Sequence, residues 1–271
     1  MEAKIKIETI VENYNKKLDV LFKEWEEKSK ENGHTGFCAD GLMFRGENWE
    51  KEVEQKMYYG KSTGEENNLW LKAKKRILFL LKDTNNNPDC DIREFRPGAN
   101  GSIGLHYENI AYWLFGLLSL NENKIAPNFE NIDFWGDVFP VFDTMPFAIV
   151  NCKKESGGST ILNETLSEHI ERYADFIKKE IEILDPDIIV CGGGSSIIKN
   201  FVKEKIYPDI EKIDDSNNWI YYSKKNNKVV IDSYHPSYWQ IEGGSKTIYE
   251  NMMSKYKEFI DKYPNFKNSC R

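Results

Sequence analysis

Residues 76–87 read RILFLLKDTNNN, and this stretch decides the fold. Its apolar run, from Ile77 to Leu81, passes directly into a polar turn that begins at Lys82. A continuous apolar run bounded by turn residues is typical of a parallel strand that is buried on both faces. Because ligands of open α/β sheets bind outside the carboxyl ends of such strands, Asp83 is the first candidate for chemistry. The alternative interpretation is a solvated Asn/Asp loop between a strand and a helix.

Further buried strands are predicted at residues 147–150, 188–191 and 229–232, the last of them in a hairpin with residues 219–222. Apolar positions at helical spacing predict helices over residues 5–30, 107–118, 166–184 and 248–263, and weak helical character over residues 51–58. Alternating strands and helices predict a parallel sheet. We therefore expect a three-layer α/β/α domain over residues 70–271, with a central, mainly parallel four-stranded sheet. Residues 1–69 are expected to form an N-terminal helical extension packed on this core.

The composition narrows the class of protein. The chain has 271 residues, of which 30% are charged, and its net charge of −7 argues against a broadly basic nucleic-acid coat. The charged N-terminus lacks an apolar signal core, and no stretch is long enough to span a membrane. Five scattered cysteines without a Cys-x-x-Cys pair indicate neither a zinc ribbon nor a disulfide framework. We expect a reduced, cytoplasmic protein.

Polar groups follow the ends of the predicted strands. They are Asp83, Asn151, the turn over residues 192–196 and His235, which precedes Pro236 and Ser237. The glycine turn at residues 192–194 lacks the spacing of a dinucleotide-binding fingerprint and the lysine of a P-loop. A tight packing turn between a strand and a helix is therefore the better interpretation. Ser195 is the candidate N-cap of that helix. Each of these signals is weak when it is taken alone.

Taken together and in order, these groups resemble the uracil-DNA glycosylase superfamily over about residues 70–260. Asp83 lies where the most active branch carries its water-activating aspartate. Asn151 follows the second strand, as in the family, and His235-Pro236-Ser237 matches the last family motif. The sequence departs from the family in the first loop, where Lys82 and Thr84 flank the acidic position instead of the usual Gly and Pro. The four cysteines that hold an iron–sulfur cluster in some branches are absent.

The resemblance implies a monofunctional DNA glycosylase that hydrolyses the N-glycosidic bond of a flipped base. Such chemistry needs a carboxylate near the sugar, for which Asp83 is the candidate, and an imidazole that hydrogen-bonds the leaving base, for which His235 is the candidate. Asn151 and Asn85 are the candidates for reading the base. An aromatic ring should stack on the base, and the candidates are Phe95, His106 and Tyr107. Candidates for contacts with the DNA backbone or for a wedge in the duplex are Ser195, Ser196, Ser237, Lys153, Tyr238 and Trp239.

Several expectations about partners follow. We expect DNA as the partner of a monomer, without a membrane partner, a cofactor, a metal or an iron–sulfur cluster. The departures in the first loop favour a base other than uracil, and defence against modified phage DNA is one hypothesis. Two alternatives stay open. Beside a DNA glycosylase, the sequence is compatible with a non-catalytic nucleic-acid-binding protein that keeps the fold, and with a nucleotide-binding α/β enzyme that uses residues 192–196.

Overall fold

The computed structural model describes residues 13–46, 49–53, 56–59, 64–85, 89–98, 100–120, 126–158 and 160–266. Its main sheet has seven strands in the order β1-β6-β4-β7-β10-β9-β8. The middle four are mutually parallel. They are β6 (Ala148–Lys153), β4 (Ile77–Asp83), β7 (Ile188–Gly192) and β10 (Lys228–Ser233).

The expectation of four strands is therefore wrong, because short antiparallel strands extend the sheet at both edges. β1 (Gly41–Leu42) pairs with β6 at one edge, and β9 (Ile220–Ser223) and β8 (Glu211–Lys212) follow β10 at the other. The sheet is thus mixed. The predicted hairpin is confirmed as the β9–β10 pair.

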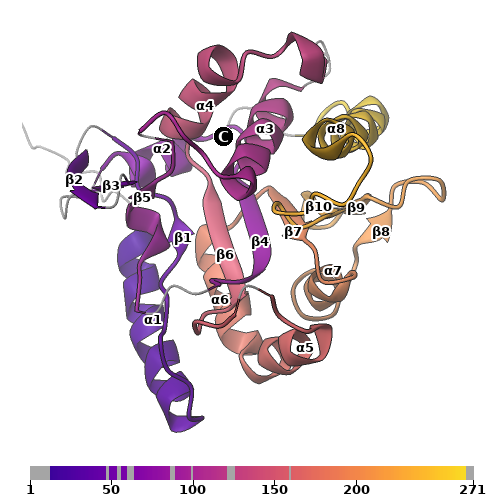
Figure 1. The fold of residues 1–271 in the computed structure, drawn as a ribbon. Coiled ribbons are helices and arrows are strands. Elements are labelled where there is room, and N and C mark those ends of the chain that lie inside the picture. The colour runs from indigo at the N-terminus through magenta and orange to yellow at the C-terminus, as the bar shows by residue number, and fades with distance from the viewer. Residues whose placement is uncertain are drawn as a thin grey trace, which may run out of the picture.

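Side chains of β4 alternate between two hydrophobic cores, one on each face of the sheet. Phe79 and Leu81 belong to one core, and Leu78 and Leu80 to the other. The first face is covered by α3 (Leu105–Ser119), α4 (Phe139–Thr144) and α8 (Gly244–Lys262). The second face is covered by α1 (Tyr14–Glu31), α5 (Asn163–Arg172), α6 (Ala174–Leu184) and α7 (Ile197–Phe201). The protein is thus a three-layer α/β/α structure (Figure 1).

The connections that follow β4 and β7 leave the sheet toward opposite faces. The chain after β4 leads to α3 on one face, whereas the chain after β7 leads to α7 on the other. Between such connections an open α/β sheet has a crevice at the carboxyl ends of its strands. The topology therefore predicts a binding site at the carboxyl end of β4.

The N-terminal part is not simply helical. The prediction of weak helical character over residues 51–58 is wrong, because β2 (Trp49–Val53) and β3 (Lys56–Tyr59) form an antiparallel pair there. β5 (Phe95–Arg96) completes this second sheet, a partner that local sequence does not reveal. The helix α2 (Glu66–Lys72) follows. Residues 5–12, predicted as the start of the first helix, lie outside the described residues, as do residues 86 and 87 of the central stretch.

The helix predicted over residues 166–184 is two helices, α5 and α6, separated at Tyr173. Its apolar spacing continues through the break, because Tyr173 is itself buried against the same core. The described residues also form two short 3-10 helices, η1 (Ile92–Glu94) and η2 (Phe129–Asn131), and two π-helical segments, η3 (Phe134–Val138) and η4 (Val202–Ile206). Among the described residues, none of the helices combines the length and apolar character needed to cross a membrane.

Candidate active site at the strand ends

A pocket of about 520 Å³ lies at the carboxyl ends of β4, β6 and β10. The pocket brings together Asp83, Asn151 and His235, although Asp83 and His235 are 152 positions apart in the sequence. This volume is within the range of about 300–1,000 Å³ that is usual for small-molecule sites. The remaining lining residues are Leu81, Lys82, Thr84, Asn85, Ile92, His106, Tyr107, Ile149, Thr160, Ile161, Ser237, Tyr238 and Trp239.

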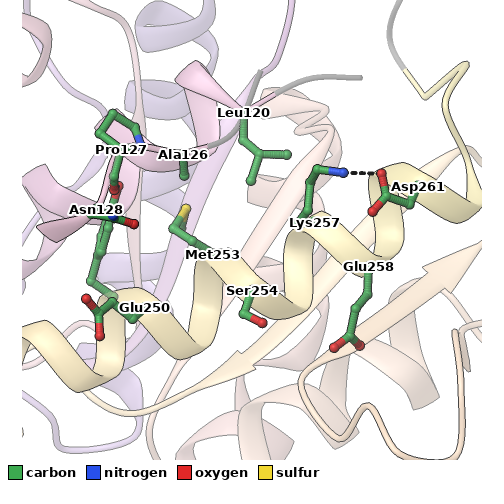
Figure 2. A pocket seen from close by; sticks show the side chains of 11 residues that line it. Leu120, Ala126, Pro127, Asn128, Glu250, Met253, Ser254, Lys257, Glu258 and Asp261 are labelled. Carbon is green, nitrogen blue, oxygen red and sulfur yellow. Dashed lines mark hydrogen bonds and ion pairs between the residues drawn. The ribbon is translucent and has the colours of Figure 1, made fainter. Parts of the chain in front are cut away.

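A second hollow, of about 430 Å³, lies between α8 and residues 126–128. Figure 2 shows Glu250, Ser254 and Lys257 on α8, with Lys257 paired to Asp261. None of the described residues lines both pockets. Of these two pockets, the strand-end pocket is the one whose described lining combines a carboxylate, an amide and imidazoles.

Asp83 is the last residue of β4 and pairs in register with Lys153 of β6. Partial burial raises the pKa of its carboxyl group, while the charges of Lys153 and Lys82 oppose that rise. An ionised carboxylate that has lost part of its hydration accepts a proton more readily than one in water. Asp83 therefore presents a partly desolvated carboxyl group at the pocket.

His235 follows β10 in a loop that other elements hold tightly. The turn after β7 packs beneath it, since a Cβ added to Gly193 would lie 3.0 Å from the Cβ of His235. A Cβ on Gly192 would lie 2.4 Å from Leu81, so this position also needs glycine. Asn109 of α3 donates from Nδ2 to the carbonyl of Pro236 at 2.6 Å. The prediction of a packing turn at residues 192–194 is confirmed.

The hydrogen bonding of His235 determines its tautomer. The backbone N–H of Ser237 donates to Nδ1 of His235 at 3.2 Å. Burial, with smaller contributions from His106 and Lys82, lowers the pKa of His235 to about 3. The imidazole is therefore neutral at physiological pH, with its single proton on Nε2. That N–H is a hydrogen-bond donor available to a bound molecule.

Asn151 is held by Asp40, a residue that the sequence did not indicate. Oδ2 of Asp40 accepts from the backbone N–H of Asn151 at 2.7 Å and from its Nδ2 at 3.0 Å. Because a carboxylate only accepts, the amide nitrogen faces Asp40, and none of the described residues donates to Oδ1 of Asn151. Asn151, which lines the pocket, therefore offers a fixed acceptor to it.

Asp40 belongs to a fully buried charged cluster. Lys154 bonds the other carboxylate oxygen of Asp40 and lies 2.8 Å from Glu180, and all three side chains are 0% exposed. Burial raises the pKa of Glu180 well above its ordinary value; Lys154 opposes this rise and Asp40 adds to it. Through Asp40, the cluster thus fixes the orientation of Asn151.

Aromatic rings form another part of the pocket lining. His106 and Tyr107, at the start of α3, line the pocket, and the ring of His106 lies 5.5 Å from that of His235. Burial lowers the pKa of His106 to about 4, so this ring is also neutral. Phe95 is not among the lining residues; its ring lies 5.4 Å from that of Tyr107. Trp239 lines the pocket and is 69% exposed, which places it at the rim.

Three residues predicted to contact DNA lie outside the pocket lining. Ser196 donates to Asp232 at 2.5 Å, and Ser196 rather than Ser195 occupies the N-cap position of α7. Lys153 is buried, and its ammonium group bonds the carbonyls of Glu155 and Ser156. Ser237, Asn85 and Tyr238 do line the pocket. Thr160 and Ile161 were missed, since their loop reaches the pocket only through the tertiary fold.

Neither the family models nor the curated proteins that were compared with this sequence gave a match. The chemistry of the site therefore carries the functional argument.

Proposed function

We propose that this protein is a DNA glycosylase that hydrolyses the N-glycosidic bond of a flipped base. One observation carries the proposal: Asp83, Asn151 and His235 line one pocket at the carboxyl ends of the parallel strands. Their chain order, and the His235-Pro236-Ser237 motif, resemble the uracil-DNA glycosylase superfamily.

The three side chains suit the charge changes of base removal. Breaking the bond leaves positive charge on the sugar and negative charge on the departing base. The Asp83 carboxylate orients water and stabilises the cationic sugar. The Nε2–H of His235 donates to the departing base, and a buried neutral imidazole can give this hydrogen bond without carrying a charge of its own.

Asn151 limits which base edge the pocket accepts. Since its Nδ2 is turned toward Asp40, the oxygen Oδ1 is the group offered to a ligand. A carbonyl oxygen requires an N–H on the base, such as N3–H of uracil or the exocyclic amine of cytosine. The pocket of about 520 Å³ leaves room for a base with a substituted ring.

The aromatic residues suit base capture. His106 and Tyr107 line the pocket and are the candidates for stacking on the flipped base. Trp239 is exposed at the rim, where an apolar wedge would enter the base stack and help to extrude the nucleotide. The hydroxyl of Ser237, also at the pocket, is a candidate donor to a phosphate.

The test is base release from defined oligonucleotides. The protein is incubated with single- and double-stranded DNA that contains uracil, other deaminated bases or bulky modified pyrimidines, and abasic sites are cleaved and counted. We expect release from at least one DNA, and loss of that release in Asp83→Asn. Asp261→Asn, which changes an exposed carboxylate on α8, is the matched control and should retain activity. Absence of abasic sites on every DNA refutes the proposal.

The alternatives make different predictions. A non-catalytic DNA-binding protein would bind DNA in a salt-dependent manner that Asp83→Asn leaves unchanged, with no release of base. A nucleotide-binding enzyme would use residues 192–196, but Gly192 and Gly193 are packed against Leu81 and His235. A role against modified phage DNA would require that Asp83→Ala abolish phage restriction.

A further inference from the structure

The four histidines occur as two pairs, and only one pair lies in the strand-end pocket. The other pair, His34 and His169, has ring centres 4.8 Å apart. Glu155 lies between them: its Oε1 is 3.6 Å from Nδ1 of His34, and its Oε2 is 3.4 Å from Nδ1 of His169. The donor atoms of all three residues lie within 4.8 Å of one another. They come from the loop after α1, the loop after β6 and the helix α5.

Two of these atoms, Oε2 of Glu155 and Nδ1 of His169, are buried and face each other at 3.4 Å. Neither makes a hydrogen bond to any other group among the described residues. The side chain of Glu155 is only 4% exposed, and Ser29 donates to its other oxygen, Oε1, at 2.7 Å. Leaving a buried carboxylate oxygen and an imidazole nitrogen unsatisfied is unfavourable, so the arrangement points to a group that both can bind.

The ligand types suit a transition metal. Imidazole nitrogens and carboxylate oxygens are donors that Zn²⁺ takes in proteins, and here two histidines and one glutamate supply them.

We propose that His34, Glu155 and His169 bind a divalent transition metal of the zinc class. Tetrahedral Zn²⁺ with ligand bonds of about 2.0–2.2 Å holds neighbouring donor atoms about 3.3–3.5 Å apart. The separations of 3.4 and 3.6 Å approach this spacing. The side chains of His34 and His169 are 22% and 11% exposed, which leaves water access to the fourth position.

Two neighbours compete with the metal. The hydroxyl of Tyr173 lies 2.7 Å from Nδ1 of His34, and metal binding replaces this hydrogen bond with a metal bond. Nη1 of the exposed Arg172 lies 3.4 Å from Nε2 of His34, where its positive charge opposes a cation. Removing the charge of Arg172 should therefore strengthen metal binding, whereas removing either histidine should weaken it.

The site would stabilise the loop that leads to the pocket. Glu155 begins this loop, the backbone N–H of Gly157 donates to the carbonyl of Asn85 at 2.8 Å, and Thr160 lines the pocket. None of the three metal ligands is among the residues that line the pocket. The metal would thus lie outside the pocket, and its binding is measured without DNA, independently of the proposed glycosylase activity.

The experiment is calorimetric titration of the chelator-treated full chain with Zn²⁺ alone, together with thermal unfolding. We expect one Zn²⁺ per chain and a Tm that rises by several degrees with metal. His34→Gln and His169→Gln should each weaken binding at least about tenfold and remove the rise in Tm. Arg172→Gln should tighten binding about threefold or more.

His106→Gln is the matched control, because it removes an imidazole from the other pair. Retained binding in this variant supports the proposal. If the chain binds no Zn²⁺, the proposal is refuted. It is also refuted if His34→Gln and His169→Gln still bind Zn²⁺ while His106→Gln does not, because the metal would then lie in the pocket. Circular dichroism at 20 °C identifies a variant that fails to fold, in which case His34→Asn and His169→Asn replace it.

Discussion

Asp83→Asn should increase stability while it removes activity. Partial burial raises the pKa of this carboxyl, so the folded state holds its proton more tightly than the unfolded chain does. Above that pKa, the ionised carboxylate therefore opposes folding, and its contribution improves only as the pH falls. An amide of the same size has no charge to bury. We expect the free energy of unfolding at pH 7 to rise by about 0.5–1 kcal/mol, a modest figure because the group is partly solvated and two lysines attract it.

The same substitution removes the group that orients water, and general-base catalysis contributes about 10²–10⁴ in rate. Two measurements on one protein therefore should change in opposite directions. Thermal unfolding should shift the Tm upward by about 1–4 °C. Single-turnover release of the base, followed by alkaline cleavage of the abasic strand, should slow by about 10²–10⁴.

A higher Tm together with slower base release would show that Asp83 serves the reaction at a cost in stability. A fall in Tm, with activity reduced only in proportion to the unfolded fraction, would show that Asp83 is structural. Unchanged activity would remove it from the mechanism altogether. Asp261→Asn, which alters an exposed ion pair on α8, should change neither quantity appreciably.

Three further predictions follow from the site. The value of kcat/KM should fall as the pH drops through the raised pKa of Asp83, because the carboxylate must be ionised. The pH profile of kcat/KM should show no further change near pH 6.5, since the pKa of His235 is about 3. A change near pH 6.5 that His235→Gln abolishes would contradict this assignment. Asp40→Asn should lower the free energy of unfolding in urea by about 1–3 kcal/mol, because the buried Lys154 loses one of its two carboxylate partners and keeps Glu180. Residual activity of the folded fraction should show weaker base discrimination, because Asn151 loses its fixed orientation. Because Trp239 is exposed, Trp239→Ala should change the free energy of unfolding by no more than about 0.5 kcal/mol. It should reduce base excision from duplex DNA about tenfold more than excision from single-stranded DNA. Equal losses of activity on the two substrates would exclude a wedge.

The central strand could be predicted from sequence because its signal is local. Residues Ile77 to Leu81 are continuously apolar, and only a strand covered on both faces buries them all. The same reasoning found β6, β7 and β10, and the polar residues that follow them. Since parallel strands end at one edge of the sheet, the sequence alone placed Asp83, Asn151 and His235 near one another.

The surroundings of these residues depended on contacts between distant segments. Asp40 bonds Asn151 across 111 residues, and no local pattern marks an aspartate that will be buried beside a lysine. Phe95 and Tyr107 are both aromatic residues near the site, but only the packing of α3 shows that Tyr107 lines the pocket. β2 and β3 are short strands whose third partner, β5, lies about 40 residues further along the chain.

By itself, then, the sequence determined the α/β class, the parallel strands and the groups at their carboxyl ends, because hydrophobic periodicity and turn residues act over a few positions. The tertiary structure decided the edge strands, the tautomer of His235, the orientation of Asn151 and the meeting of His34, Glu155 and His169. These features depend on which side chains share a buried space, and burial is set by the packing of the whole chain.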